Sequence, residues 1–358
     1  MQLEPTPEQA EMRRAVREFC SREVTIERLL GWERDATGVD EATSRTVAGL
    51  GWLGLGLPPE VGGGGASLAD VAHLFEECGR GLLPRPLLAR MRGALGLAWL
   101  APQSPMLAAV ARGERSVALA LDERDAREPA GWRTRLAADG RSVSGDKAFV
   151  PDAAAADLHL VAIGGSGQPR FVLVDARTPS VSCAALHSFG NEPQAHVSYR
   201  EAAVLEVLEG GVDFDELRRR QVALALAEMV GGMDAALAAS VGWVKEREQF
   251  GQKIALFQAV RHQIADMGTR FTSARHLAWQ AISRLAAGGL DATDLDSAAA
   301  WTGASFKQIC WTAHHLHGGA GFVVEHPLRF HSERAQSLCI RWTPEAPALA
   351  RIAATLLD

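Results

Sequence analysis

The feature that most limits the possible folds of this chain is a block of short apolar runs set between two long helical stretches. From Ser116 to about residue 212, six or seven β-rich runs such as SVALALD, LHLVAIG and RFVLVDAR are separated by Gly, Pro and Asp. Runs spaced this closely predict a small antiparallel sandwich or barrel. The flanking sequence has helical periodicity, so the predicted order is helix, sheet, helix.

Helix start signals support this order. Thr6-Pro7-Glu8-Gln9 combines an N-cap, a proline at the first helical position and a capping-box glutamine. The apolar loop GWLGLGLPPEVGGGGA (51–66) precedes a second helix that we expect to be capped near Ser67. The sequence thus predicts a mostly α protein with a central β domain, divided into an N-terminal helical domain (1–115), a middle β domain (116–212) and a C-terminal helical domain (213–358).

Composition excludes several classes of partner. The 358 residues exceed what one hydrophobic core usually organises. The net charge is −6, with no large basic tract, which argues against a nucleic-acid partner. The sequence shows no membrane-spanning run and no signal-peptide core, so we expect a cytoplasmic protein without a membrane partner. The five cysteines lack metal-ligand spacing and predict reduced thiols and no bound metal.

The segment REQFGQKI, residues 247–254, places a glycine and a phenylalanine within a strong helical pattern. Glycine in a helix interior costs about 1 kcal/mol relative to alanine. Two interpretations are open on spacing alone. Two helices could meet at a glycine stop. Alternatively, Gly251 lets a ligand approach the backbone while Arg247 pairs with a phosphate and Phe250 packs on a ring.

A second glycine cluster follows a predicted helix near the C-terminus. The stretch HHLHGGAGFVVEHP begins at His314 and contains three glycines. A helix C-cap and turn is its simplest interpretation. It is not a Rossmann fingerprint, which follows a strand and opens a helix, and it has no Walker A lysine.

Taken in order, these motifs resemble the acyl-CoA dehydrogenase family. The resemblance covers almost the whole chain through GWLGLGLPPEVGGGGAS, GRSVSGDKAFVPDA, REQFGQKIALFQAVRHQIADM and HGGAGFVVEHP. It implies a helical N-terminal domain, a β-barrel-like middle domain and a C-terminal four-helix bundle. It also implies an FAD at a subunit interface and oxidation of the Cα–Cβ bond of an acyl-CoA, in which a carboxylate removes the α-proton and the flavin accepts the β-hydride. Electron-transfer flavoprotein is the redox partner that the resemblance implies.

The resemblance also assigns cofactor-binding residues. In the family, the Arg and Phe of RxxFG and the Gln of FQ contact the ADP half of an FAD held mainly by the neighbouring subunit, and a glycine turn approaches the same FAD. The matching residues here are Arg247, Phe250, Gly251, Gln258, His315, Gly318 and Gly319. His315 replaces the glutamine with which the family turn usually begins, and remains a possible donor.

The strands that hold the flavin ring in the family are altered here. The family's Thr-Glu and Trp-Ile-Ser/Thr strands correspond to Asp122-Glu123 and Phe149-Val150-Pro151. Pro151 has neither a hydroxyl nor an N–H to donate. Asp122 brings an anion to a position where the family has a hydroxyl.

No catalytic residue is assigned. The catalytic carboxylate is absent from both of its usual family positions, which hold Trp342 and Gln221, and neither side chain is a general base. Glu345 lies three residues beyond Trp342 and would serve only with a shifted backbone. We interpret Glu228 as a structural carboxylate that is paired with another group inside a helix.

Two functions within this family remain open, beside a third possibility, a flavin-dependent or flavin-independent relative with other chemistry on the same fold. The favoured one is a partner subunit that completes the FAD site of a homologous catalytic chain in a heterotetramer, as in the shorter subunits of heteromeric steroid-side-chain acyl-CoA dehydrogenases. The alternative is a self-sufficient homo-oligomeric acyl-CoA dehydrogenase whose base is not recognised. Either would act on an acyl-CoA in fatty acid or steroid catabolism.

Overall fold

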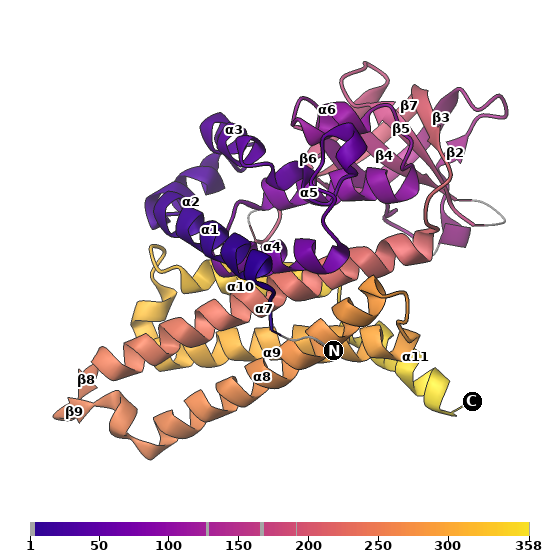
Figure 1. Cartoon of the computed structure of the whole chain (residues 1–358). Helices are drawn as coiled ribbons and strands as arrows, with labels where there is room; N and C mark the ends of the chain where they lie inside the picture. The colour runs from indigo at the N-terminus through magenta and orange to yellow at the C-terminus, as the bar shows by residue number, and fades with distance from the viewer. Residues whose placement is uncertain (1–3, 127–128, 165–167, 191, 358) are drawn as a thin grey trace. The chain divides into compact units, whose positions relative to one another are not determined.

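The computed structural model describes residues 4–126, 129–164, 168–190 and 192–357, which run from helices through strands to helices (Figure 1). The first helices are α1 (Pro7–Glu23), α2 (Ile26–Arg34), α3 (Glu41–Gly49), α4 (Leu68–Arg80), α5 (Arg85–Leu100) and α6 (Leu107–Ala111). The strands are β1 (Val117–Ala120), β2 (Arg135–Leu136), β3 (Ser142–Pro151), β4 (Leu158–Ile163), β5 (Arg170–Asp175), β6 (Val181–Leu186) and β7 (Gln194–Leu208). The last helices are α7 (Phe214–Glu246), α8 (Gln258–Ala286), α9 (Ala292–His317), α10 (Leu328–Arg341) and α11 (Glu345–Leu357). The predicted fold class, mostly helical with a central sheet, is confirmed.

Capping side chains explain where two of the helices begin. Thr6 Oγ1 accepts a hydrogen bond from the backbone N–H of Gln9 at 3.2 Å, and Gln9 Oε1 accepts one from the backbone N–H of Thr6 at 2.9 Å. Ser67 and Asp70 make the same reciprocal pair at the start of α4. Both capping boxes occupy N–H groups that a helix leaves without an internal partner.

The chain forms two compact units. The helical unit contains Met1–Leu30, Ser67–Leu83 and Arg219–Asp358, and the sheet unit contains Gly31–Ala66 and Pro84–Arg218. The three-domain division of the sequence remains a prediction.

In the sheet unit, the long strand β7 joins two sets of shorter strands. It pairs with β5 through residues 204–208 and with β3 and β6 through residues 194–203, antiparallel in each case. The strand order is β1-β4-β5-β7-β3-β2, with β6 also on β7, and β1 pairs with β4 in parallel. Buried Val, Ala and Ile side chains fill the interior. Two polar groups inside satisfy each other: His159 Nε2–H donates to the Ala153 carbonyl at 2.9 Å, so its Nδ1 accepts from the Tyr199 hydroxyl at 2.9 Å.

The helical unit is organised around α7, whose middle part is apolar on all sides. By length and composition α7 could span a membrane, but 67% of its most apolar window is buried inside the protein. Leu226, Met229, Val230 and Met233 of α7 pack with buried residues of α8, α9 and α10 in one core cluster. A helix that is hydrophobic all round is expected at such a central position.

Two glycines let α4 and α7 pack with their backbones in contact. A Cβ added at Gly79 of α4 would lie 2.1 Å from the Glu228 carbonyl oxygen of α7. A Cβ added at Gly231 of α7 would lie 1.7 Å from the Glu76 carbonyl oxygen of α4. Real Cβ atoms do not approach backbone oxygens this closely, so the crossing requires glycine at both positions.

A buried network of charges ties α4 to α1 and α8. Arg13 bridges Glu76 at 2.7 Å and Glu77 at 2.8 Å, and Arg17 binds Glu77 with two hydrogen bonds of 3.0 and 2.7 Å. On the other side, Trp279 Nε1–H donates to Glu76 at 2.7 Å. Two adjacent carboxylates can be buried here because each has charged or N–H partners.

A histidine beside this network, His73, is expected to make the stability of the folded chain sensitive to acid. The His73 ring stacks on Trp279, with centroids 4.1 Å apart, and its Nδ1 accepts a hydrogen bond from Arg13 at 3.0 Å. Burial, together with the Arg13 charge, lowers the pKa of His73 from 6.5 to about 4. In the unfolded chain the His73 side chain takes up a proton near its ordinary pKa of 6.5, before the folded protein does. The free energy of unfolding is therefore highest above pH 6.5 and decreases as the pH falls towards 4. The loss is up to about 3 kcal/mol, at about 1.4 kcal/mol per pKa unit.

Urea unfolding at several pH values between 7.5 and 4.5 measures this effect. We expect His73→Gln to show a smaller loss of stability on acidification than the wild type. The variant still loses some stability on acidification, because burial lowers the pKa of His331 to about 3, and this histidine also destabilises the folded chain as the pH falls. The exposed His262 supplies the control, since His262→Gln should keep the wild-type slope. Equal slopes in His73→Gln and the wild type would contradict the assignment.

Candidate functional site

The RxxFG segment forms a tight β-hairpin between α7 and α8. Strands β8 (Glu248–Gln249) and β9 (Gln252–Lys253) pair antiparallel, with Phe250 and Gly251 as the two turn residues. Both turn residues have positive φ, +54° and +78°, as a type I′ turn requires. The segment is therefore a hairpin rather than the simple glycine stop between helices. An added Cβ at Gly251 meets nothing within 4 Å, so the backbone there is open to an approaching group.

Phe250 combines backbone strain with exposure. A bulky residue at positive φ costs roughly 1–2 kcal/mol. Its side chain is nevertheless 92% exposed, and its ring lies edge-on to Phe257 at a centroid distance of 6.1 Å. The helical unit thus holds an apolar ring out in solvent in a costly conformation, which is typical of a contact residue for another molecule.

Arg247 lies at the base of the hairpin and is also exposed. Its guanidinium carbon lies 5.7 Å from the centroid of the Trp243 ring, one helical turn earlier. Within the described residues, no carboxylate pairs with this guanidinium. Arg247 is therefore available to bind an external anion such as a phosphate.

The glycine cluster forms the turn after α9. The 3₁₀ helix η5 (Gly318–Phe322) follows directly, and Gly318 has a φ of +57°. Gly318 and Gly319 are exposed, with nothing within 4 Å of an added Cβ. His315 on the last turn of α9 and Gln258 at the start of α8 are exposed as well. All seven predicted cofactor-binding residues therefore lie on the surface of the helical unit.

The segments from which the hairpin and the glycine turn depart are joined through Trp243, although about seventy residues separate them in sequence. Trp243, near the end of α7, donates a hydrogen bond from Nε1 to the Leu316 carbonyl at 3.1 Å. Its ring also stacks on His317, with centroids 5.2 Å apart and planes at 20°. The sequence interpretation missed Trp243. Its position four residues before Arg247 on the same helix could have indicated that the two side chains are neighbours. Nothing in the sequence indicated its contact with α9.

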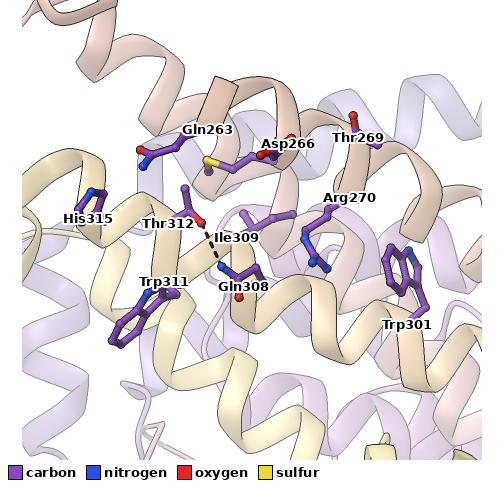
Figure 2. Close-up of a pocket in the computed structure, with 11 residues that line it drawn as sticks. Gln263, Asp266, Thr269, Arg270, Trp301, Gln308, Ile309, Trp311, Thr312 and His315 are labelled. Atoms are coloured by element: carbon purple, nitrogen blue, oxygen red, sulfur yellow. Dashed lines mark hydrogen bonds between the residues drawn. The ribbon is translucent and has the colours of Figure 1, made fainter. Parts of the chain in front are cut away.

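A groove between α8 and α9 extends away from His315. It has a volume of about 640 Å³ and runs along side chains of both helices, with Gln263 and His315 towards one end and Arg270 and Trp301 towards the other (Figure 2). Trp301 Nε1–H donates to Ser273 Oγ at 2.9 Å, and the Arg270 guanidinium carbon lies 5.3 Å from the Trp301 ring. The groove has a mixed aromatic and polar lining, and we assign it no ligand.

The altered strands of the sheet unit do not fit the polar edge of a flavin ring. Pro151 is buried in β3 opposite Gln194 and has no N–H. The Glu123 carboxylate is already used, since it accepts hydrogen bonds from the backbone N–H groups of Arg133 at 2.6 Å and Thr134 at 3.0 Å, and from Lys147 at 3.2 Å. The Asp122 carboxylate and the Phe149 ring supply no side-chain donor.

The two family positions for the catalytic base hold no base in this chain. Gln221 is fully buried in α7. Trp342 follows α10 and packs against the helical core, with the Arg341 guanidinium 5.0 Å from its ring. Glu345 begins α11 and lies 3.8 Å from Lys307 Nζ in a half-exposed ion pair. The Glu228 side chain is buried in α7.

Comparison with known proteins identifies the family of this chain. Models described as acyl-CoA dehydrogenase N-terminal domain and acyl-CoA dehydrogenase C-terminal domain match residues 6–100 and 215–342. Acyl-CoA dehydrogenase FadE28 of Mycobacterium tuberculosis is 30% identical over 340 residues, which cover 93% of this chain and 92% of FadE28.

Solved structures show the same architecture. The Tcur3481-Tcur3483 steroid ACAD G363A variant aligns with a TM-score of 0.89 and 28% identity over 98% of both chains. The ChsE4-ChsE5 complex of Mycobacterium tuberculosis aligns with a TM-score of 0.90 over 100% of this chain and 99% of that chain. Its identity of 22% shows a shared fold alone. Because FadE28 matches along nearly the whole length and both terminal domains are recognised, this chain belongs to the acyl-CoA dehydrogenase family of FAD-dependent oxidoreductases.

Proposed function

We propose that this chain is the partner subunit of a heteromeric acyl-CoA dehydrogenase and completes the FAD site of a homologous catalytic chain. One observation carries the proposal: Phe250 is 92% exposed on a positive-φ turn beside Arg247, which has no carboxylate partner among the described residues. A chain gains nothing by itself from holding an apolar ring and a cation in this way. Both gain partners when another subunit brings a dinucleotide to the hairpin.

The residues of this chain would bind and orient the ADP half of the cofactor. Arg247 supplies a fork of N–H donors for a phosphate. Phe250 supplies an apolar face for a ring, and Gly251, Gly318 and Gly319 leave the backbone open for close approach. Gln258 and His315 supply side-chain donors at the same surface. When bound, FAD supplies the acceptor for the β-hydride of the acyl-CoA.

Removal of the α-proton is assigned to the catalytic chain. Gln221 and Trp342 occupy the two family positions and neither accepts a proton at neutral pH. The altered strand pair of this chain, ending in Pro151, also argues that the chain holds no flavin ring of its own. The subunit would therefore contribute binding and orientation, and the homologous chain the base.

Similarity to the Tcur3481-Tcur3483 steroid ACAD, whose name joins two proteins, supports the partner role. We extend the proposal to a steroid-derived acyl-CoA as substrate, electron-transfer flavoprotein as acceptor and a cytoplasmic location. The cysteines support the last point, since all five are free.

A visible absorption spectrum, combined with mass determination, tests the proposal. The chain expressed alone is expected to be colourless. Co-expression with a homologous dehydrogenase chain that carries the catalytic carboxylate should give a yellow heteromer with about one FAD per two chains. A yellow homo-oligomer with one FAD per chain, reduced by an acyl-CoA, would instead establish the self-sufficient enzyme and make Glu345 the first candidate for its base.

A further inference from the structure

We propose that Trp243 is a positioning residue that fixes the RxxFG hairpin against the glycine turn, so that both present one surface to the dinucleotide. This inference rests on the proposed function and deepens it. Its basis is a set of contacts around one indole ring, all within the helical unit. Trp243 itself is half-buried and need not touch the cofactor.

On one side, Trp243 holds the end of α9. Its Nε1–H donates to the Leu316 carbonyl at 3.1 Å, and this carbonyl lies in the last turn of the helix, where internal partners run out. The ring also stacks on His317 at 5.2 Å, immediately before Gly318. The indole thus fixes the last two residues of α9 from which the glycine turn departs.

The state of His317 favours this stacking. Its Nδ1–H donates to the Ala313 carbonyl at 2.7 Å, and its ring lies edge-on to His326 at 4.9 Å. Burial lowers the pKa of His317, so the imidazole is neutral at neutral pH. A neutral ring stacks on the indole without adding a second positive charge beside Arg247.

On the other side, Trp243 supports the base of the hairpin. Its carbonyl accepts the backbone N–H of Arg247 at 2.9 Å, and its ring lies 5.7 Å from the Arg247 guanidinium carbon. A cation above an indole face is attracted to it and loses freedom to point elsewhere. The backbone carbonyl of Arg247 in turn accepts a hydrogen bond from the backbone N–H of Ile254 at 2.9 Å, which closes the hairpin.

The other polar ties of the hairpin are local. Lys253 Nζ donates to the Glu246 carbonyl at 3.0 Å and pairs with Glu248 at 2.9 Å. Within the described residues, the hydrogen bonds and ion pairs of 247–254 join only residues between 243 and 257. Trp243 is thus the residue through which the hairpin acquires a hydrogen-bonded connection to the end of α9.

Two substitutions separate the contributions of the indole. Trp243→Phe keeps an aromatic ring for Arg247 and His317 but removes the N–H, and Trp243→Ala removes both. Trp301→Phe is the matched control. It also removes one indole N–H hydrogen bond, the one to Ser273 Oγ, from a tryptophan whose ring lies under an arginine, Arg270, in the same unit. The first readout is amide hydrogen exchange of residues 248–253 and 318–322 in the chain alone. The second is the FAD dissociation constant of the co-expressed heteromer.

For Trp243→Phe we expect exchange in both segments to accelerate about tenfold and FAD to bind about tenfold more weakly, as the loss of one hydrogen bond implies. Trp243→Ala should weaken FAD binding at least as much, whereas Trp301→Phe should match the wild type in both readouts. Wild-type exchange in both segments of Trp243→Phe would overturn the proposal, as would acceleration in the hairpin alone. If the wild-type heteromer binds no FAD, the proposed function fails, and the exchange experiment still decides whether Trp243 couples the two segments.

Discussion

Arg247→Ala is expected to weaken FAD binding by the heteromer about 100-fold while leaving the stability of the free chain unchanged. A charge-assisted hydrogen bond to a phosphate contributes about 1.5–3 kcal/mol, and about 2.8 kcal/mol corresponds to 100-fold. In the free chain the side chain is exposed and has no carboxylate partner among the described residues, so its removal costs little. Fluorescence titration of the apo-heteromer with FAD gives the affinity, and thermal unfolding of the free chain gives the stability.

A neighbouring cation provides the control for this experiment. Lys245 is exposed two residues earlier on α7, so Lys245→Ala removes the same net charge from the same region. It is expected to change FAD affinity less than threefold, because long-range attraction between exposed charges is screened at physiological salt. Equal losses in the two variants would show that the region acts through general positive charge, and would refute a specific phosphate contact at Arg247.

Gly231→Ala is expected to prevent the helical unit from folding normally. The added methyl carbon would lie 1.7 Å from the Glu76 carbonyl oxygen and 2.7 Å from the Arg80 nitrogen. Both atoms belong to the backbone of α4, so no side-chain rotation relieves the clash. Overpacking against side chains costs about 1–3 kcal/mol, and we expect about 3 kcal/mol or more here. That is a large part of the stability of a typical domain.

The same helix carries a matched control. An added Cβ at Gly242 of α7 meets nothing within 4 Å. Gly242→Ala should therefore stabilise α7 by up to about 1 kcal/mol through helix propensity alone. Soluble yield and melting temperature distinguish the two variants, and a wild-type melting temperature for Gly231→Ala would contradict the close crossing of α4 and α7.

The order of helices and strands could be predicted from the sequence because its signals are local. The capping box at Thr6 and Gln9 involves two residues three positions apart, and the sheet is indicated by alternating apolar runs within fewer than a hundred residues. The hairpin at Phe250 could not be predicted, because helical periodicity on both sides hides a two-residue turn. Its strained phenylalanine also departs from the glycine or asparagine that such turns prefer.

The candidate site was predictable only as a list of residues. The family resemblance assigned Arg247 and Gly319 to one cofactor, and their place in its binding remains a prediction. The contact that joins their segments depends on Trp243 and Leu316, which are seventy-three residues apart. Likewise, the full use of the Glu123 carboxylate depends on backbone N–H groups ten and eleven residues away. Such contacts are set by tertiary packing, which periodicity and spacing do not encode.

The discontinuous build of the helical unit has a consequence for its synthesis on the ribosome. Helices α1 and α4 emerge early, but Trp279, which donates to Glu76 of α4, follows about two hundred residues later. Until then, the paired carboxylates of α4 lack the Trp279 N–H, and for most of this interval the apolar face of α4 also lacks α7. At 5–20 residues per second this delay is roughly 10–40 seconds. We therefore expect the nascent N-terminal helices to be a target for chaperones, and truncations before α8 to aggregate rather than to yield a folded fragment.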